Sequence, residues 1–520
     1  MNAATGGAVY LGSGDTSARA TITADASGAE LSIISDASSQ GGDVVFGKAD
    51  GTGGDWLESF TINAGTQAVI DGTIVTNSGL VGTSNGNGIS ITGTLNLVVS
   101  TTLDTHDASD AAGGGPVTLT GLVSARSAGL GLVIDAGSTA PGQSGGDITL
   151  DAVGSGPAYV AGLTARTGGP GGPGRLILRN RILLDGSPTT GASFVFDPGS
   201  NGGPGTVLVR ADSAIDTEQG GDGPAGDILL GGTTVASATA VITTDAVGID
   251  LALVTEGTAS GRVAFGDVDN SGNKYLQTFM ADADSPTGTD GLIRVNGIAL
   301  ATSGTAVAGD ITLAGSRVEF SSPAVSLSTA NGATAVDAGA IDLTGTVAML
   351  AAGAELSLDT STSTPGRRGG AIRLDAVGAS SAYPKALTLS TSGPVAANAG
   401  EVFLGGDILL EGGNLILGNV APVAIERSVV IDTAQAAPIA EAQAAQGILK
   451  SELKSLRDTH SALTVCSTLE PVIRAAHEAE ANLRMAHDNG ATVPLEFGQV
   501  HVAIESAATA FESIGLAALE

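Results

Sequence analysis

Short stretches of alternating apolar and polar residues recur along most of the chain. The clearest form is a phrase of a small residue, Gly, any residue, Ile or Val, any residue, and Leu or Phe. Copies begin at positions 308, 338, 369 and 399, so neighbouring copies are 30 or 31 residues apart. Alternation with a period of two predicts a β-strand with one buried face.

Two further strand-like pieces lie between successive copies of this phrase. After 308–313 they are residues 317–320 and 324–328, and turns rich in Gly, Ser and Asp join them. Three short strands in every unit of about 30 residues favour a parallel β-solenoid, in which each coil stacks on the previous one. The pattern predicts a mainly β protein, with about 14 coils over residues 1–432.

A longer period is superimposed on the short one. Residues 41–77 match residues 260–296 at a constant offset of 219, and Leu150–Gly154 matches Leu374–Gly378 at an offset of 224. The sequence therefore predicts that the solenoid consists of two modules of about 220 residues, at about 6–200 and 225–418.

The composition changes near residue 433. Gly becomes rare, and Ala, Glu, Leu and Lys, which favour helices, become common. Apolar residues then recur mostly three or four positions apart, as in amphipathic helices. We expect residues 433–520 to form an α-helical bundle that either caps the last coil or assembles chains by self-association.

Composition narrows the class of protein. The 520 residues include 78 Gly and only 3% aromatic residues, and the net charge is −31. Such acidity argues against nucleic acid as a partner, because phosphate binding needs clustered Lys and Arg. With one Cys, no disulfide forms within the chain, and no apolar run is long enough to span a membrane as a helix. The first residues do not resemble a signal peptide, which suggests a fragment or a missing export segment.

Three sequence units resemble those of a known group of proteins. They are the strand phrase, the pattern Gly-x-x-Asp-x-Ser/Thr-Gly followed by Trp/Tyr-Leu-x-Ser/Thr-Phe, and Leu-Asp-Ala-Val-Gly. Over about residues 6–432 they are similar to the repeats of very large bacterial surface proteins of the β-strand-repeat, filamentous-haemagglutinin-like group. The resemblance implies a right-handed, secreted or cell-surface β-helix that is often adhesive, and it brings no active site with it.

Three sets of polar residues are candidates for binding. Arg166, Arg175, Arg179 and Arg181 are dense for so arginine-poor a chain, and either bind an anionic sugar or phosphate or pair with neighbouring carboxylates. Asp267, Asp269, Ser271 and Asn273 place oxygens at alternate positions, as in a calcium loop, but Thr278 replaces the usual Glu. Aspartates precede several strands, at 43, 147, 227, 310 and 407, and either form a calcium ladder or bond to amides of their own turn.

No nucleophile, phosphate-binding loop or metal motif accompanies these candidates. The leading hypothesis is therefore a non-enzymatic structural or adhesive rod, outside the cell or on its surface, with no cofactor except for the calcium alternative. Its expected partners are cell-surface or matrix components, glycans among them. The alternative is a β-helix polysaccharide lyase, or a glycan-binding protein, acting on anionic sugars at the arginines.

Overall fold

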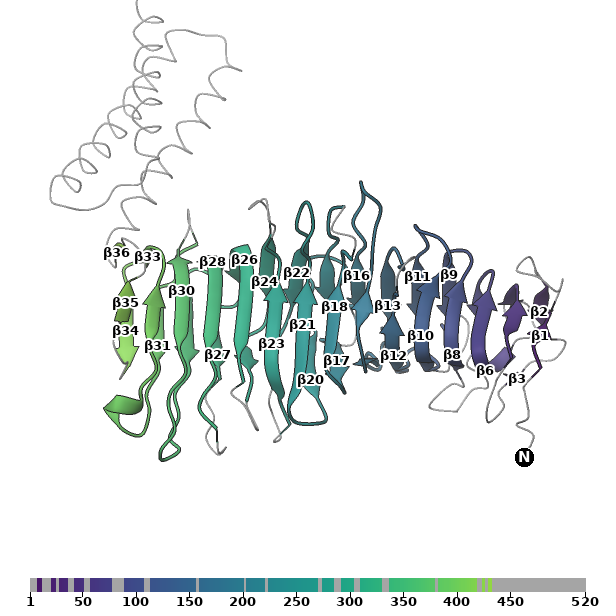
Figure 1. The fold of residues 1–520 in the computed structure, drawn as a ribbon, viewed down its shortest axis with the longest axis horizontal. Helices are drawn as coiled ribbons and strands as arrows, with labels where there is room; N and C mark the ends of the chain where they lie inside the picture. The colour runs from purple at the N-terminus through teal and green to yellow at the C-terminus, as the bar shows by residue number, and fades with distance from the viewer. Residues whose placement is uncertain are drawn as a thin grey trace, which may run out of the picture.

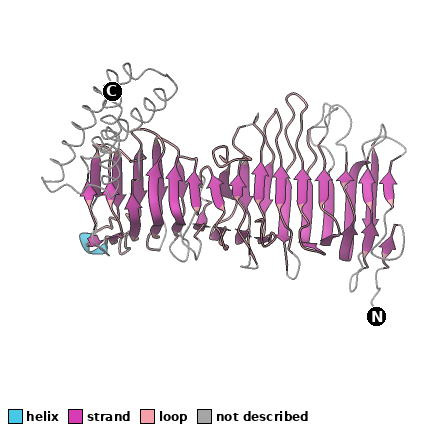
Figure 2. Cartoon of the chain, turned by 90° about the horizontal axis from the view of Figure 1, so that it is seen from above, coloured by secondary structure: helices cyan, strands magenta, loops and turns pink. Residues whose placement is uncertain are grey.

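The computed structural model describes residues 7–432, apart from 12–19, 25–27, 36–41, 51–56, 77–87, 107–112, 156–158, 201–202, 220–222, 270–273, 285–290, 304–308, 330–335, 379–381, 419–422 and 426–428. These residues form a rod of parallel β-strands that lie across its long axis (Figures 1 and 2). The predicted β-solenoid is confirmed. The helical bundle predicted at 433–520 lies outside the described residues, whose one helical element is the short 3₁₀ helix η1 (Ala396–Asn398).

The strands form three faces, which the chain visits in the order 1, 2, 3 in every turn. Several long strands bend at a corner and serve two faces. Face 1 contains β1 (Val9–Tyr10), β4 (Val44–Phe46), the ends of β6 (Leu57–Ile70), β8 (Ile89–Leu97), β10 (Val117–Ala125) and β12 (Ile148–Val153), then β15 (Ile182–Leu183), β18 (Ser213–Asp216), β21 (Ile249–Val254), β23 (Leu276–Asp282), the starts of β26 (Ile311–Phe320), β28 (Ile341–Met349) and β30 (Ile372–Val377), β32 (Val402–Leu404) and β35 (Val423–Ile425).

Face 2 follows face 1 within each turn. It contains β2 (Thr21–Thr23), β5 (Lys48–Asp50), β7 (Ile74–Val75), β9 (Thr101–Asp104), β11 (Leu132–Asp135), β13 (Leu163–Arg166), β16 (Phe194–Asp197), β19 (Ile228–Leu230), β22 (Arg262–Phe265), β24 (Leu292–Val295), the ends of β26, β28 and β30, β33 (Ile408–Leu409) and β36 (Ile431–Asp432).

Face 3 completes the turn. It contains β3 (Ala29–Ile34), the starts of β6, β8, β10 and β12, β14 (Arg175–Leu178), β17 (Thr206–Val209), β20 (Val241–Thr244), an isolated bridge at Val268, β25 (Ala299–Ala301), β27 (Ala324–Ser328), β29 (Glu355–Asp359), β31 (Ala386–Ser390) and β34 (Asn414–Gly418).

About 11 turns have a strand with buried side chains on all three faces, so the predicted count of about 14 is too high. The difference arises at the two ends, where the strands are short or exposed, and at Val268, where face 3 contributes only a bridge. Inside the rod, alternate residues of every face stack into one continuous apolar core. Its side chains are mainly Leu, Ile and Val, with Ala and Phe between them, and their burial supplies most of the stabilisation.

A threonine clamp closes many of the loops. A buried Thr at the end of one strand donates its hydroxyl hydrogen to the carbonyl of a Gly one or two residues before the next strand. The pairs are Thr105–Gly115, Thr167–Gly174, Thr217–Gly226, Thr302–Gly309, Thr329–Gly339, Thr360–Gly370 and Thr391–Gly400, at 2.6 to 3.1 Å. Because the clamp fixes only the two ends of a loop, the loop length varies while the strand register is kept.

The sequences that recur at a distance of about 220 residues do not lie on the same face. Phe46 ends a strand of face 1, whereas Phe265, which is 219 residues later, ends a strand of face 2. Their partners shift in the same way, since Phe60 is on face 3 and Phe279 is on face 1. The ring contacts are kept, with centroids 5.4 Å apart in the first pair and 5.1 Å in the second. The second copy is therefore advanced by one face around the rod; the module boundaries stay a prediction.

Candidate functional site

The aspartates that precede strands connect one turn to the next. Asp147, Asp227, Asp310 and Asp407 each accept a hydrogen bond, at 2.7 to 2.9 Å, from a backbone N–H of the following turn. Asp43 accepts its bond from the Gln67 side chain, also in the following turn. The expectation that these residues bond to their own turn is wrong, because in a stacked solenoid the nearest amide in register belongs to the neighbouring turn.

Two of these aspartates also bind an arginine. Arg175 follows Asp147 by one turn and donates a hydrogen bond from its guanidinium at 2.6 Å, in addition to its backbone bond. Arg262 binds Asp227 in the same way. The hydrogen bond to Asp147 raises the pKa of the Arg175 guanidinium, and Asp227 does the same to Arg262. Both arginines stay charged and are held against the rod.

The four predicted arginines lie at two different corners of the turn. Arg166 and Arg175 flank the loop between faces 2 and 3, whereas Arg179 and Arg181 lie at the bend between β14 and β15, which separates faces 3 and 1. Arg166 is 3.6 Å from Asp135, and Arg179 is 3.6 Å from Asp151. The structure thus does not gather the four into one cluster, and their predicted role in binding an anionic ligand stays a prediction.

Arg166 belongs to a column of charges on face 2. Strand pairing places Asp104, Asp135, Arg166 and Asp197 in register over four successive turns. Asp104 and Asp135 are like charges side by side; burial raises the pKa of Asp104, and the charge of Asp135 adds to the increase. Arg166 separates Asp135 from Asp197, so its charge limits repulsion along the column.

The predicted calcium loop is described only in part. Ser271 and Asn273 lie outside the described residues. The Asp267 carboxylate accepts hydrogen bonds from the amides of Ile298 and Ala299 in the next turn, at 2.6 and 2.9 Å, so one of its oxygens holds two turns together. In the part of the chain that the structure describes, no three His, Cys, Asp or Glu side chains are grouped as a metal site would need.

A charged trio that the repeat pattern does not indicate lies on the outside of face 2. Glu319 forms ion pairs with Arg294, at 2.8 Å, and with Arg317, at 3.0 Å, and its side chain is only 9% exposed. Arg294 is its register neighbour in the previous turn. A buried carboxylate between two guanidinium groups is well neutralised, which fits a structural role.

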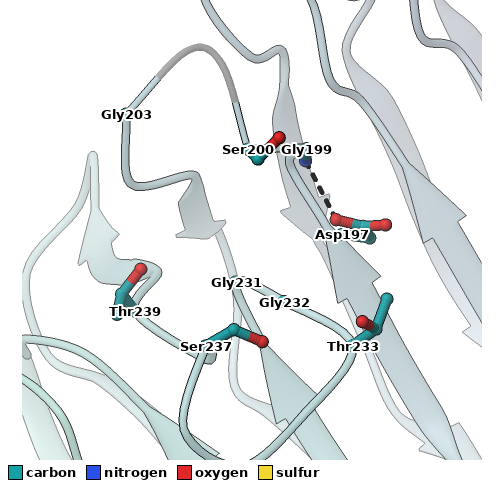
Figure 3. A pocket seen from close by; sticks show the side chains of 9 residues that line it. All are labelled: Asp197, Gly199, Ser200, Gly203, Gly231, Gly232, Thr233, Ser237 and Thr239. Carbon is teal, nitrogen blue, oxygen red and sulfur yellow. Dashed lines mark hydrogen bonds between the residues drawn. The ribbon is translucent and has the colours of Figure 1, made fainter.

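A hollow lies outside the core, at the corner between faces 2 and 3. It has a volume of about 420 Å³ and opens between the loop after β16 and the loop after β19. Figure 3 shows Asp197 and the hydroxyl side chains of the two loops around this opening. The lining consists of Asp197, Gly199, Ser200, Gly203, Gly231, Gly232, Thr233, Ser237 and Thr239.

One wall of the hollow is a loop, residues 231–240, that folds back over the outside of the rod. Val235 and Ala238 of this loop pack on the outward side chains Leu229 and Ala264 and form a small second core. From the end of β24, Asn296 donates to the carbonyls of Val235 and Ala238, both at 2.8 Å. The loop is therefore held in one position by contacts from several turns.

Sequence reasoning missed this hollow, although a signal was present. Between Leu230 and Val241 the chain has a Gly-Gly pair followed by a Ser/Thr-rich stretch, and no strand phrase. The outward Leu229 and Ala264, which break the apolar–polar alternation, indicate that something covers face 2 there.

Comparison with known proteins gives no relative: the chain matches no family model, no curated protein and no solved structure. The resemblance to bacterial surface repeats therefore extends only to the β-solenoid repeat fold. Among the described residues no helix is long and apolar enough to cross a membrane.

Proposed function

We propose that the protein is a non-enzymatic rod with a structural and adhesive role, located outside the cell or on its surface. The observation that carries the proposal is that many of its aspartate side chains bind the backbone of an adjacent turn. Asp147, Asp151, Asp227, Asp310, Asp375 and Asp407 all accept backbone amides of an adjacent turn. Carboxylates held in this way join neighbouring turns of the rod, and they are poorly placed to transfer a proton to or from a substrate.

The alternative is a polysaccharide lyase or a binding protein for anionic sugars. Such an enzyme needs acids and bases that converge on one groove. Of the four arginines, Arg166, Arg175 and Arg179 already have carboxylate partners, and the four lie at two corners. This arrangement favours the rod over the enzyme.

The test separates the two functions with the full chain. Purified protein is incubated with polygalacturonate, alginate, hyaluronan and chondroitin, and unsaturated products and new reducing ends are measured. In parallel, retention on surfaces coated with the same polymers or with matrix proteins is recorded. We expect retention on at least one surface and no product. Product formation that is lost in an Arg179→Ala, Arg181→Ala double variant would establish the enzyme and refute the proposal.

The last turn of the described rod has a surface suited to docking. Ile416, Leu417, Val423, Ile425 and Ile431 are 37% to 62% exposed there. Within the described residues, β34, β35 and β36 each pair with a strand on one side only, which leaves an open edge. Residues 433–520 follow β36 directly, and their sequence has the amphipathic pattern that would cover such a surface. We propose that this segment of the same chain covers the end of the rod.

A further inference from the structure

The hollow between the loops after β16 and β19 contains polar groups that the rod itself does not use. Asp197 accepts a hydrogen bond from the Gly199 amide through Oδ1, at 2.9 Å. Among the described residues, no partner is found for its other oxygen or for the hydroxyls of Thr233 and Thr239. All three side chains line the hollow. Elsewhere on the rod the comparable Asp135 binds both an amide and an arginine.

The lining excludes two classes of ligand. It has no aliphatic or aromatic side chain larger than the methyl groups of threonine, so an apolar ligand would gain little from entering. It has no Lys, Arg or His, and its one charged side chain is the acid Asp197, so the lining offers an anion no cationic partner. A carboxylate, hydroxyls and bare peptide groups suit a ligand with many hydroxyl groups, since each of these both donates and accepts hydrogen bonds.

One wall of the hollow, the loop of residues 231–240, is held in position before any ligand arrives. Gly231 and Gly232 both donate their amides to the carbonyl of Phe196, at 2.9 and 3.0 Å, and so join the second loop to the base of the first. At Gly231, where φ is +102°, an added Cβ would lie 2.0 Å from the Ala240 nitrogen. The Asn296 bonds hold the far side of the loop. A wall that is already ordered avoids part of the entropic cost of binding.

We propose that this hollow binds a neutral sugar residue of a glycan. Its volume of about 420 Å³ lies at the lower end of the range of about 300 to 1,000 Å³ typical of ligand sites, which suits one or two sugar residues. The free oxygen of Asp197 accepts from sugar hydroxyls, and Thr233 and Thr239 bond to the neighbouring hydroxyls. This inference goes beyond the proposed function and does not depend on it.

The test measures binding of full-length protein to a panel of oligosaccharides by saturation-transfer NMR and calorimetry. The panel contains neutral gluco-, manno-, galacto- and chitin oligosaccharides, uronic-acid oligosaccharides, and chitosan oligosaccharides as the cationic counterpart of chitin. We expect a neutral member to bind, and Asp197→Ala to weaken its binding about tenfold or more, as expected for loss of a charge-assisted hydrogen bond. Thr233→Ala, Thr239→Ala should weaken binding by a smaller factor.

The matched control is Asp359→Ala. Asp359 also ends a strand and also accepts the amide two residues later, at 2.9 Å, but it lies far along the rod from the hollow. We expect the affinity of the Asp359→Ala variant for the oligosaccharide to stay within about twofold of that of the unchanged protein. The inference is overturned if no neutral oligosaccharide binds at millimolar concentration, if only uronic-acid or chitosan oligosaccharides bind, or if Asp359→Ala weakens binding as much as Asp197→Ala.

Discussion

The carboxylate of Asp151 accepts a hydrogen bond from the backbone N–H of Gly121, one turn earlier, at 3.0 Å. Asp375, 224 residues after Asp151, binds the N–H of Gly345 in the same way and at the same distance. Both glycines have positive φ, +117° and +95°, where the strand bends at a corner. The first corner joins faces 3 and 1, and the second joins faces 1 and 2. The sequence repeat thus preserves the local contact while its position rotates by one face.

Replacing Asp375 should therefore weaken the rod at one corner. In Asp375→Ala the Gly345 amide loses its acceptor, which should lower the free energy of unfolding by about 1 to 2 kcal/mol. Urea unfolding of the full chain measures this. Glu355→Ala, an acid-to-alanine change at an exposed position on face 3, is the control and should cost less than about 0.5 kcal/mol. Equal effects of the two substitutions would contradict the role given to Asp375.

The threonine clamps predict that a Thr→Val substitution lowers the free energy of unfolding at a clamped Thr and raises it at an unclamped buried Thr. Thr360 is fully buried and donates to the Gly370 carbonyl at 2.6 Å, so Thr360→Val should lower the free energy of unfolding by about 1 to 2 kcal/mol. Thr255 is equally buried, but its hydroxyl has no hydrogen-bond partner among the described residues. Thr255→Val should therefore stabilise the fold, by about 1 kcal/mol.

The same unfolding measurement checks both threonine variants. Thr312→Val, at a partly exposed outward position of β26, controls for the change in β-propensity and should lie near zero. If Thr255→Val destabilises the rod as much as Thr360→Val does, the clamp is not what distinguishes the two sites.

An acidic cluster near the middle of the rod should make stability depend on pH. Burial, the hydrogen bond and charge of Asp282, and the charges of Asp216 and Asp284 raise the pKa of Glu256 above its ordinary value of 4.5. The folded chain thus keeps a proton that the unfolded chain releases. The stabilisation that protonated Glu256 gives to the folded state is fully present below pH 4.5 and is lost as the pH rises through the folded-state pKa.

Glu256→Gln removes this dependence. We expect the variant to melt at a higher temperature than the unchanged protein at pH 7, with the difference shrinking toward pH 4.5, as followed by calorimetry at several pH values. A difference that is constant over this pH range, or that grows toward low pH, would contradict the raised pKa of Glu256.

The end of the rod gives a prediction about residues 433–520. If this segment covers the last turn, Ile425 is buried in the whole protein, and Ile425→Glu should lower the free energy of unfolding by about 1 to 3 kcal/mol. Ile298→Glu is the matched control, because Ile298 is 61% exposed on the rod where Ile425 is 62% exposed. Thermal unfolding and light scattering of the full chain report both stability and mass.

Three results are distinguishable in that experiment. Destabilisation by Ile425→Glu alone, in a protein that stays monomeric, supports coverage by the same chain. A dimer or larger assembly that Ile425→Glu dissociates shows that a second copy covers the end instead. If both substitutions leave stability and mass unchanged, the end of the rod is open to solvent and the proposed docking is wrong.

The fold class could be predicted from the sequence because a solenoid repeats one local pattern. Alternation around residues such as Ile311 and Leu313 identifies the inward side of a strand without knowledge of its neighbours. The number of complete turns is harder to predict from the sequence. Strands such as β1 and β36 have the right alternation, but they lie at the ends, where no further turn buries them.

The site was less predictable, because it depends on which turns are adjacent. Nothing in the sequence near Asp147 indicates that its partner is Arg175 in the next turn, since loop length sets that register. The hollow requires Asn296 to reach a loop about 60 residues earlier. Such contacts follow from stacking and not from local pattern.

The most direct test of the account is a cross-link between turns. Ser326 and Ser357 are register partners on the outside of β27 and β29, and Thr388 lies one turn further, on β31. Adjacent parallel strands are about 4.8 Å apart, which suits a disulfide, whereas two turns, about 9.6 Å, do not. In a Cys466→Ser background, Ser326→Cys combined with Ser357→Cys should form the disulfide nearly completely, and Ser326→Cys combined with Thr388→Cys should not. Equal cross-linking of both pairs, or of neither, would contradict the stacked solenoid.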